Sequence, residues 1–179
     1  MKRNITIAAV GLMMIIVLTS AIILTGEIAK ASNVYYYLPY FQTNASGVTY
    51  CVASNMSSES LTVSFTVGSN PNGNPTGTAN TFATTLASKT TRQYAFSGQT
   101  VTGGSDTISI SSDAGTSDAY AGTLTFSTTA TTTGTRATCK SLIMACFQGT
   151  TSPRRNLIGY ICEDDSTSGP GGNKIMLGF

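Results

Sequence analysis

The feature that most constrains the fold is a strict two-residue alternation over residues 60–67, Ser-Leu-Thr-Val-Ser-Phe-Thr-Val. Every second residue is apolar, and the residues between them are all Ser or Thr. Successive side chains of a β-strand point to opposite faces of the sheet, so this pattern predicts a strand with one face in a core and the other in water. Thr suits the wet face because its branched Cβ fits the pleat. An antiparallel sheet with one solvated face is therefore expected.

Similar short segments follow along the rest of the chain, and stretches rich in Gly, Asn or Ser separate most of them. No segment after residue 32 has the apolar spacing of a helix. About nine or ten short strands with turns between them predict an all-β fold, an antiparallel β-sandwich, with an up-and-down barrel as the alternative. The expected strands are residues 34–41, 48–54, 60–67, 81–87, 91–96, 107–111, 120–127, 138–148, 156–163 and 174–179.

The first 31 residues have the pattern of an export signal, with a basic start and an apolar run over residues 5–24. Small residues at Ala29 and Ala31 fit a signal peptidase, which predicts cleavage before Ser32. The apolar run is also long enough to span a bilayer as a helix, so an uncleaved anchor is the alternative. In both cases residues 32–179 are expected to form one domain that is extracellular or at the cell surface, because the positive end stays inside. Only the uncleaved segment would contact a membrane.

Composition removes several functional classes. The chain has no His, which excludes a Ser-His-Asp triad, a Cys-His pair and a His-ligated metal. It also lacks the G-x-S-x-G, Ser-x-x-Lys and phosphate-loop motifs. Three of the ten basic residues and one of the eight acidic residues lie in the first 31 residues, so the exported part is close to neutral. We therefore expect no enzyme, no cofactor and no nucleic-acid partner, and a surface that does not repel its own copies.

The four cysteines, an even number, all lie in the expected exported part, where disulfides are the default. No C-x-x-C pair is present, so a thiol metal site is not expected. Cys139 and Cys146 share one expected strand at odd separation and would point to opposite faces, which disfavours a bond between them. A hairpin of the last two long strands around residues 149–155 can place Cys139 opposite Cys162. This register favours the pairs Cys139–Cys162 and Cys51–Cys146 among the three connectivities.

Residues 34–41, Val-Tyr-Tyr-Tyr-Leu-Pro-Tyr-Phe, are aromatic on both faces of an expected strand. Pro39 has no backbone N–H, which predicts an edge strand. A strand covered on both sides, or one at the rim of a sheet, would explain the pattern. The alternative is an interaction surface for a sugar ring, a peptide or another subunit. The candidate interaction residues are Tyr36 and Tyr40 on one face and Tyr35, Tyr37 and Phe41 on the other.

Three short motifs leave further alternatives open. Asn44 and Asn55 each begin an Asn-x-Ser glycosylation sequon. The adjacent acids of residues 163–165 can bind Ca²⁺ or lie in a solvated loop. Residues 174–179 alternate and end in Phe, which is similar to the end of bacterial outer-membrane barrels.

The opening Tyr-Tyr-Tyr-Leu-Pro-Tyr-Phe, the segment Gly-Val-Thr-Tyr-Cys-Val-Ala-Ser-Asn of residues 47–55 and the alternating strand from Ser60 resemble the first half of uncharacterised exported bacterial β-sandwich domains. Those domains begin with an aromatic-Pro-aromatic strand and continue with a strand that ends in Asn. The resemblance implies a surface or envelope protein without a known reaction.

Together these patterns predict an exported, non-enzymatic structural or binding protein of the cell surface, the matrix or an extracellular filament. Its expected partners are its own copies, other surface proteins or a glycan. The alternatives are a small outer-membrane β-barrel and a carbohydrate- or calcium-binding module.

Overall fold

The computed structural model describes residues 32–42, 47–69, 77–110, 119–128, 137–150, 155–165 and 175–177. All of them belong to one structural unit, Ala31–Phe179. Across these ranges the regular structure is entirely β, and none of it is a helix that could cross a membrane. The expected signal or anchor segment, residues 1–31, lies outside the described residues.

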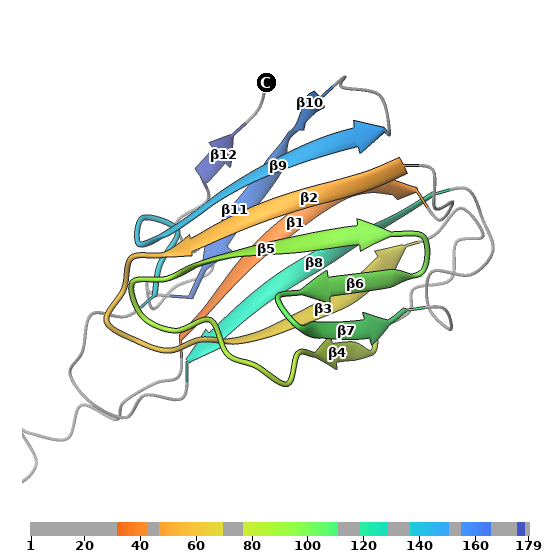
Figure 1. Cartoon of the computed structure of the whole chain (residues 1–179). Coiled ribbons are helices and arrows are strands. Elements are labelled where there is room, and N and C mark those ends of the chain that lie inside the picture. The colour runs from red at the N-terminus through yellow and green to blue at the C-terminus, as the bar shows by residue number, and fades with distance from the viewer. Residues whose placement is uncertain are drawn as a thin grey trace, which may run out of the picture. The chain divides into compact units, whose positions relative to one another are not determined.

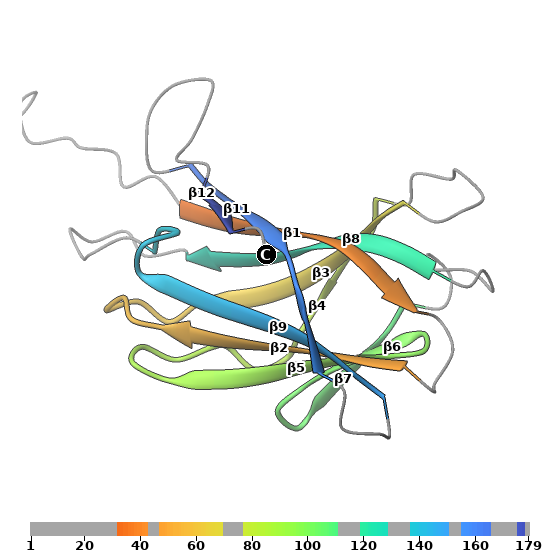
Figure 2. The same cartoon turned by 90° about the horizontal axis from the view of Figure 1, so that it is seen from above.

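The described residues form two six-stranded sheets in which every strand pair is antiparallel (Figure 1). The first sheet has the order β12-β11-β1-β8-β3-β4 and the second β10-β9-β2-β5-β6-β7. Figure 2 shows them as two layers, the arrangement of a sandwich. The strands are β1 (Ser32–Gln42), β2 (Gly47–Asn55), β3 (Thr62–Ser69), β4 (Ala79–Thr81), β5 (Thr91–Ser97), β6 (Thr100–Gly103), β7 (Asp106–Ser109), β8 (Ala119–Thr128), β9 (Leu142–Thr150), β10 (Arg155–Ile158), β11 (Tyr160–Asp164) and β12 (Ile175–Leu177).

The alternating segment of residues 60–67 confirms the prediction made from its pattern. Val63, Phe65 and Val67 in β3 are completely buried between the sheets, whereas Thr62 faces solvent. Leu61, just before β3, is also buried and forms an isolated bridge to Leu86. The period of two therefore sets which side of β3 faces the core.

Aromatic rings from both sheets meet in the core. The ring of Phe41 in β1 stacks on that of Phe96 in β5, with centroids 4.2 Å apart. Phe65 in β3 meets Phe96 edge-on at 5.0 Å, and Tyr94 in β5 meets Phe126 in β8 at 6.0 Å. Such pairs add about 0.5–1.5 kcal/mol each beyond the burial of their area. The two layers are thus held together by aromatic contacts.

Two tyrosine hydroxyls also connect the layers. Tyr36 in β1 donates to the backbone carbonyl of Leu142, and Tyr160 in β11 donates to that of Met144. Both acceptors belong to β9 of the opposite sheet. These bonds satisfy the hydroxyls of Tyr36 and Tyr160, which are buried with their rings.

β1 is not an edge strand, so the prediction drawn from Pro39 is wrong. β1 pairs with β8 on one side and, over Val34–Tyr37, with β11 on the other. Pro39 lies beyond the β11 pairing and within a bulge of the β8 pairing between Leu38 and Phe41. A residue without an N–H is tolerated there because no regular ladder bond is required of it.

The segments expected at residues 138–148 and 156–163 also differ from the prediction. β9 begins only at Leu142, and a turn over residues 138–141 precedes it. β10 forms the expected hairpin with β9, but the strand is interrupted at Gly159. There the chain leaves the second sheet and continues in the first as β11, which pairs with β1.

Residues 81–87 form a strand only at their start, because β4 ends at Thr81. Phe82 and Leu86 lie beyond the end of β4 and bury their side chains in the core. β6 was not predicted from the sequence, because no strand was expected between residues 96 and 107. Two-residue turns join β5 to β6 and β6 to β7, and each begins with a glycine of positive φ, 57° at Gly98 and 66° at Gly104. Glycine adopts this conformation without the steric cost of a Cβ.

Candidate interaction surfaces

The four cysteines form two disulfides among the described residues. Cys51 in β2 lies directly opposite Cys146 in β9, with Cα atoms 4.1 Å apart, and both side chains are completely buried. This bond closes a pair of neighbouring strands in the second sheet. Disulfides are typical of oxidising compartments.

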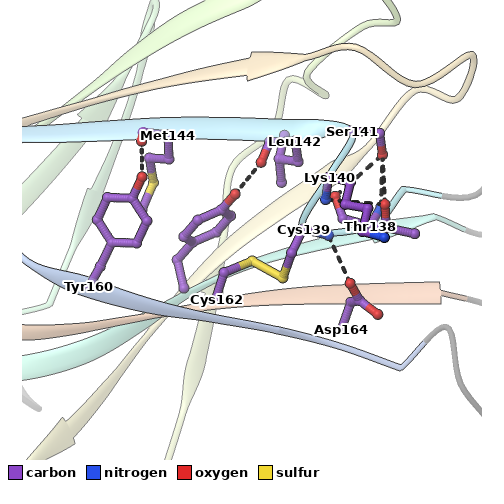
Figure 3. The surroundings of a disulfide bond; sticks show 10 residues. Thr138, Cys139, Lys140, Ser141, Leu142, Met144, Tyr160, Cys162 and Asp164 are labelled. Carbon is purple, nitrogen blue, oxygen red and sulfur yellow. Dashed lines mark hydrogen bonds between the residues drawn. A yellow bond between two sulfur atoms is a disulfide. The ribbon is translucent and has the colours of Figure 1, made fainter. Parts of the chain in front are cut away.

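The second disulfide joins the two sheets. Cys139, in the turn before β9, bonds to Cys162 in β11, with Cα atoms 5.9 Å apart (Figure 3). The buried carboxylate of Asp164 accepts a hydrogen bond from the Cys139 backbone N–H at 2.8 Å. The pairing is the one that the sequence favours, but the hairpin argument for it is wrong. Cys139 and Cys162 are not neighbours in one hairpin, because β11 belongs to the other sheet.

The adjacent acids of residues 163–165 make separate contacts. Asp164 holds the Cys139 turn, and Asp165 accepts hydrogen bonds from the backbone N–H and the side-chain amide of Asn33 at 2.8 and 3.1 Å. Glu163 interacts with the hydroxyl of Tyr37. No group of three or more acidic, Cys or His side chains in the described part of the chain is placed to hold a metal ion. These acids therefore serve as structural contacts.

Asn55 organises the loop after β2 and is completely buried. Its amide donates to the backbone carbonyls of Glu59, Leu86 and Ala87 at 2.7, 3.3 and 3.2 Å. Its side-chain oxygen accepts from the N–H and hydroxyl of Ser57. A glycan would replace one of the two amide hydrogens and would need space that a completely buried side chain lacks, so glycosylation does not suit Asn55 in the folded chain. Asn44 lies outside the described residues.

The residues of the predicted signal cleavage lie at the border of the described chain. Ala29 and Ala31 are outside it. Ser32 is the first residue of β1, is 1% exposed and pairs with Thr128. A peptidase needs an extended, accessible bond, so the predicted cleavage before Ser32 requires that β1 has not yet formed.

The five candidate aromatic residues do not alternate between the two faces of β1 as they would in a regular strand. Tyr36 and Phe41 are 2% and 1% exposed and belong to the core, whereas Tyr37 and Tyr40 are each 41% exposed. The β1 bulge causes the difference, because it turns Phe41 inward and Tyr40 outward. Tyr35 is half-buried on the outer face, and its ring stacks on Tyr37 with centroids 6.4 Å apart. Partial burial and the nearby Glu163 carboxylate raise the pKa of Tyr37.

Beside Tyr37, the outer face of the first sheet contains an apolar hollow of about 420 Å³. It extends across β3, β8, β1 and β11, and this volume lies in the range of ligand-sized pockets. We call this feature the hollow. Its outward-facing lining residues include Tyr37, Pro39, Gly68, Ala121, Thr123 and Ile161.

Gly122 lies beneath the hollow, where the sheet is irregular. A Cβ at Gly122 would lie 2.2 Å from the Phe65 ring and 2.8 Å from the carbonyl oxygen of Thr66, so only glycine fits. The register of β8 shifts against both β1 and β3 immediately before Gly122. Bulges bend strands and increase their twist. Small residues and two bulges thus form a depression in an otherwise regular face.

The outer face of the second sheet carries a group of neighbouring apolar side chains. Cross-strand pairing places Tyr50 beside Phe147 and Val52 beside Ala145, with Ile143 next along β9. Ile143 is 59% exposed and Tyr50 36%. The outward positions of β9, β2 and β5 hold no charged side chain among the described residues. We call this group the apolar stripe: Val48, Tyr50, Val52, Ile143, Ala145 and Phe147.

Neither the hollow nor the apolar stripe was found from the sequence, although a signal for the stripe is present. β2 is apolar at both alternating sets of positions, and residues 142–147 form a continuous apolar run. Such strands are typical of sheets covered on both faces. In a sandwich of two layers only one face of each sheet is covered by the other, so packing between the described strands does not account for the apolar residues on this outer face.

No model of a known protein family, no curated protein and no solved structure matches the chain. The resemblance of its first strands to exported bacterial β-sandwich domains therefore stays a prediction.

Proposed function

We propose that this chain is an exported structural protein of the cell surface, the surrounding matrix or an extracellular filament. It acts by binding through its sheet faces and does not catalyse a reaction. The observation that carries this proposal is the apolar stripe, an uncharged face on a domain braced by two disulfides. Neighbouring apolar side chains that are exposed, as Tyr50 and Ile143 are here, are typical of an interaction site in a soluble protein.

Three further observations support it. The expected exported part is close to neutral, so no long-range repulsion opposes the approach of a second copy. The chain also has no His, and the acids adjacent in sequence at residues 163–165 are used in separate structural contacts. The two disulfides suit the oxidising exterior of a cell.

Sedimentation of the exported chain tests the proposal. The full-length chain is expressed with its N-terminal segment in a host that exports it, and the exported product is purified without reductant. We expect its average mass to rise with concentration beyond that of a dimer. A product that stays monomeric over the whole accessible range of concentrations contradicts a structural role by self-association.

A second candidate function is glycan binding, and it rests on the outer face of the first sheet. Tyr35 and Tyr37 form a stacked aromatic surface, and the Glu163 carboxylate lies within reach of the Tyr37 hydroxyl. Sugar rings stack on aromatic faces, while carboxylates accept hydrogen bonds from their hydroxyls. The apolar lining of the adjoining hollow suits a sugar less well.

A glycan array tests this candidate with Tyr37→Ala as the variant and Tyr40→Ala as the control. Binding that Tyr37→Ala removes and Tyr40→Ala retains supports it, whereas no binding by the wild-type chain ends it. Tyr36→Ala is unsuitable as a surface variant because Tyr36 is a core residue.

A further inference from the structure

The apolar stripe and the hollow lie on opposite outer faces of the sandwich, and both are apolar. The stripe projects side chains, of which Ile143 is the most exposed. The hollow is a depression lined largely by apolar and small residues. A projecting apolar group that fits a pocket elsewhere on the same molecule produces a head-to-tail contact, which repeats without closing.

The charges beside the two surfaces have opposite signs. Glu163 stands on the outer face of β11 next to Tyr37, a lining residue of the hollow. Lys140 lies exposed in the turn that leads into the end of the stripe at Ile143, and the exposed Lys89 donates to the Met56 carbonyl just after β2. Complementary charges around an apolar contact favour one orientation of approach.

The sheet edges offer a poorer route to assembly. The first sheet ends in β4 and β12, each of three residues, and the second ends in β7 and β10, each of four. Very short edge strands are a device that limits edge-to-edge pairing. The longer strands β1, β2, β8 and β9 lie inside the sheets. Association through strand addition is therefore disfavoured relative to association through faces.

We infer that copies of this chain stack head to tail, with the apolar stripe of one copy seated in the hollow of the next. Ile143 and its neighbours on β9 and β2 enter the depression beside Tyr37, Ala121 and Ile161 of the following copy. Each assembly keeps one free stripe at one end and one free hollow at the other, so it grows as an open filament and not as a closed dimer. This inference rests on the proposed structural function and specifies its geometry.

Mixing two blocked variants tests the geometry. Ile143→Glu blocks the stripe and leaves the hollow intact, whereas Ala121→Glu blocks the hollow and leaves the stripe intact. The introduced charges have the same sign, so the two blocked surfaces do not attract each other. Thr107→Glu on β7 and Thr62→Glu on β3 are matched controls, because both positions are exposed and neither belongs to the stripe or lines the hollow.

Sedimentation at a concentration where the wild-type chain assembles gives the readout. We expect each blocked variant alone to have the mass of one chain and the equimolar mixture to have the mass of two chains and no more. Both controls should assemble like the wild type. Circular dichroism and a melting curve check that the variants fold, and Phe147→Glu with Ile161→Glu is a second pair on the same surfaces.

The possible outcomes distinguish a failure of the head-to-tail geometry from a failure of the proposed structural function. Self-association of Ala121→Glu alone to a dimer would indicate a symmetric stripe-to-stripe contact, which overturns the head-to-tail geometry but leaves self-assembly intact. If both blocked variants assemble like the wild type, the contact lies elsewhere. This result also overturns the head-to-tail geometry but leaves self-assembly intact. A wild-type chain that never assembles overturns both proposals.

Discussion

At the scale of single residues, Asn55 shows how one buried polar side chain can define a loop. Its amide satisfies three carbonyls from two segments, and its oxygen holds Ser57. Asp has the same shape as Asn but no amide donors. In Asn55→Asp, a carboxylate oxygen would therefore face the three carbonyl oxygens that accept hydrogen bonds from the amide. We expect it to destabilise the fold by about 3 kcal/mol or more, measured by urea unfolding.

Asn80→Asp is the matched control for that substitution. The Asn80 amide makes one long hydrogen bond at the surface, 3.4 Å to the Thr78 carbonyl. Its replacement should change stability by no more than about 0.5 kcal/mol. Equal losses for the two variants would show that the Asn55 network does not hold the loop.

Gly122 makes a second prediction at this scale. Gly122→Ala should cost about 1–3 kcal/mol, because the new methyl group overlaps the Phe65 ring. Gly68→Ala, whose Cβ has no neighbour closer than 4.0 Å, should be nearly neutral. In a double-mutant cycle, Phe65→Leu should cost less in the Gly122→Ala background than in the wild type. Additive losses would place the strain outside this contact.

At the scale of elements, the two disulfides differ in the length of chain that they close. Cys51–Cys146 spans 95 residues and Cys139–Cys162 spans 23. The chain-entropy model gives about 4–5 kcal/mol for the longer loop and about 3–4 kcal/mol for the shorter one. Replacing the first pair by Ala should therefore lower the urea midpoint more than replacing the second.

The two disulfides also differ in how accessible they are to a reductant. Cys51 and Cys146 are completely buried, whereas Cys139 is partly exposed in a turn. Mild reductant under native conditions should release the thiols of Cys139 and Cys162 first, as read by alkylation and peptide mapping. Simultaneous release of all four thiols would mean that global unfolding precedes any reduction.

The elements also show what the sequence can and cannot predict. Strict alternation located β3 and the inward face of its side chains, because the period of two is a local property. The face of Tyr40 and Phe41 was not predictable, since it depends on a bulge against β8. The change of sheet at Gly159 likewise depends on pairing partners far apart in the chain. The hollow combines residues from four strands, so no local sequence pattern predicts it.

At the scale of the whole molecule, buried tyrosines predict sensitivity to alkali. Burial raises the pKa of Tyr94 to about 12, although Arg92 acts in the opposite direction, and burial also raises the pKa of Tyr36 and Tyr120. In the unfolded chain these groups ionise near pH 10. The unfolded state then releases protons that the folded state retains, so stability is complete below about pH 10 and falls as the pH rises toward 12.

Far-ultraviolet circular dichroism and phenolate absorbance, recorded together against pH, measure this effect. The signal of the sheet should disappear as the last tyrosines ionise, and the urea midpoint should fall steadily above about pH 10. Complete ionisation of all tyrosines with the sheet signal unchanged would contradict their placement in the core.

The account as a whole depends on a chain that leaves the cytoplasm and oxidises there. The most direct measurement is the mass of the purified product after alkylation, with and without prior reduction. We predict a chain that begins at Ser32 and takes up alkyl groups on its four cysteines only after reduction, with peptide maps linking Cys51 to Cys146 and Cys139 to Cys162. A cytosolic product that alkylates at all four cysteines without reductant would contradict the account.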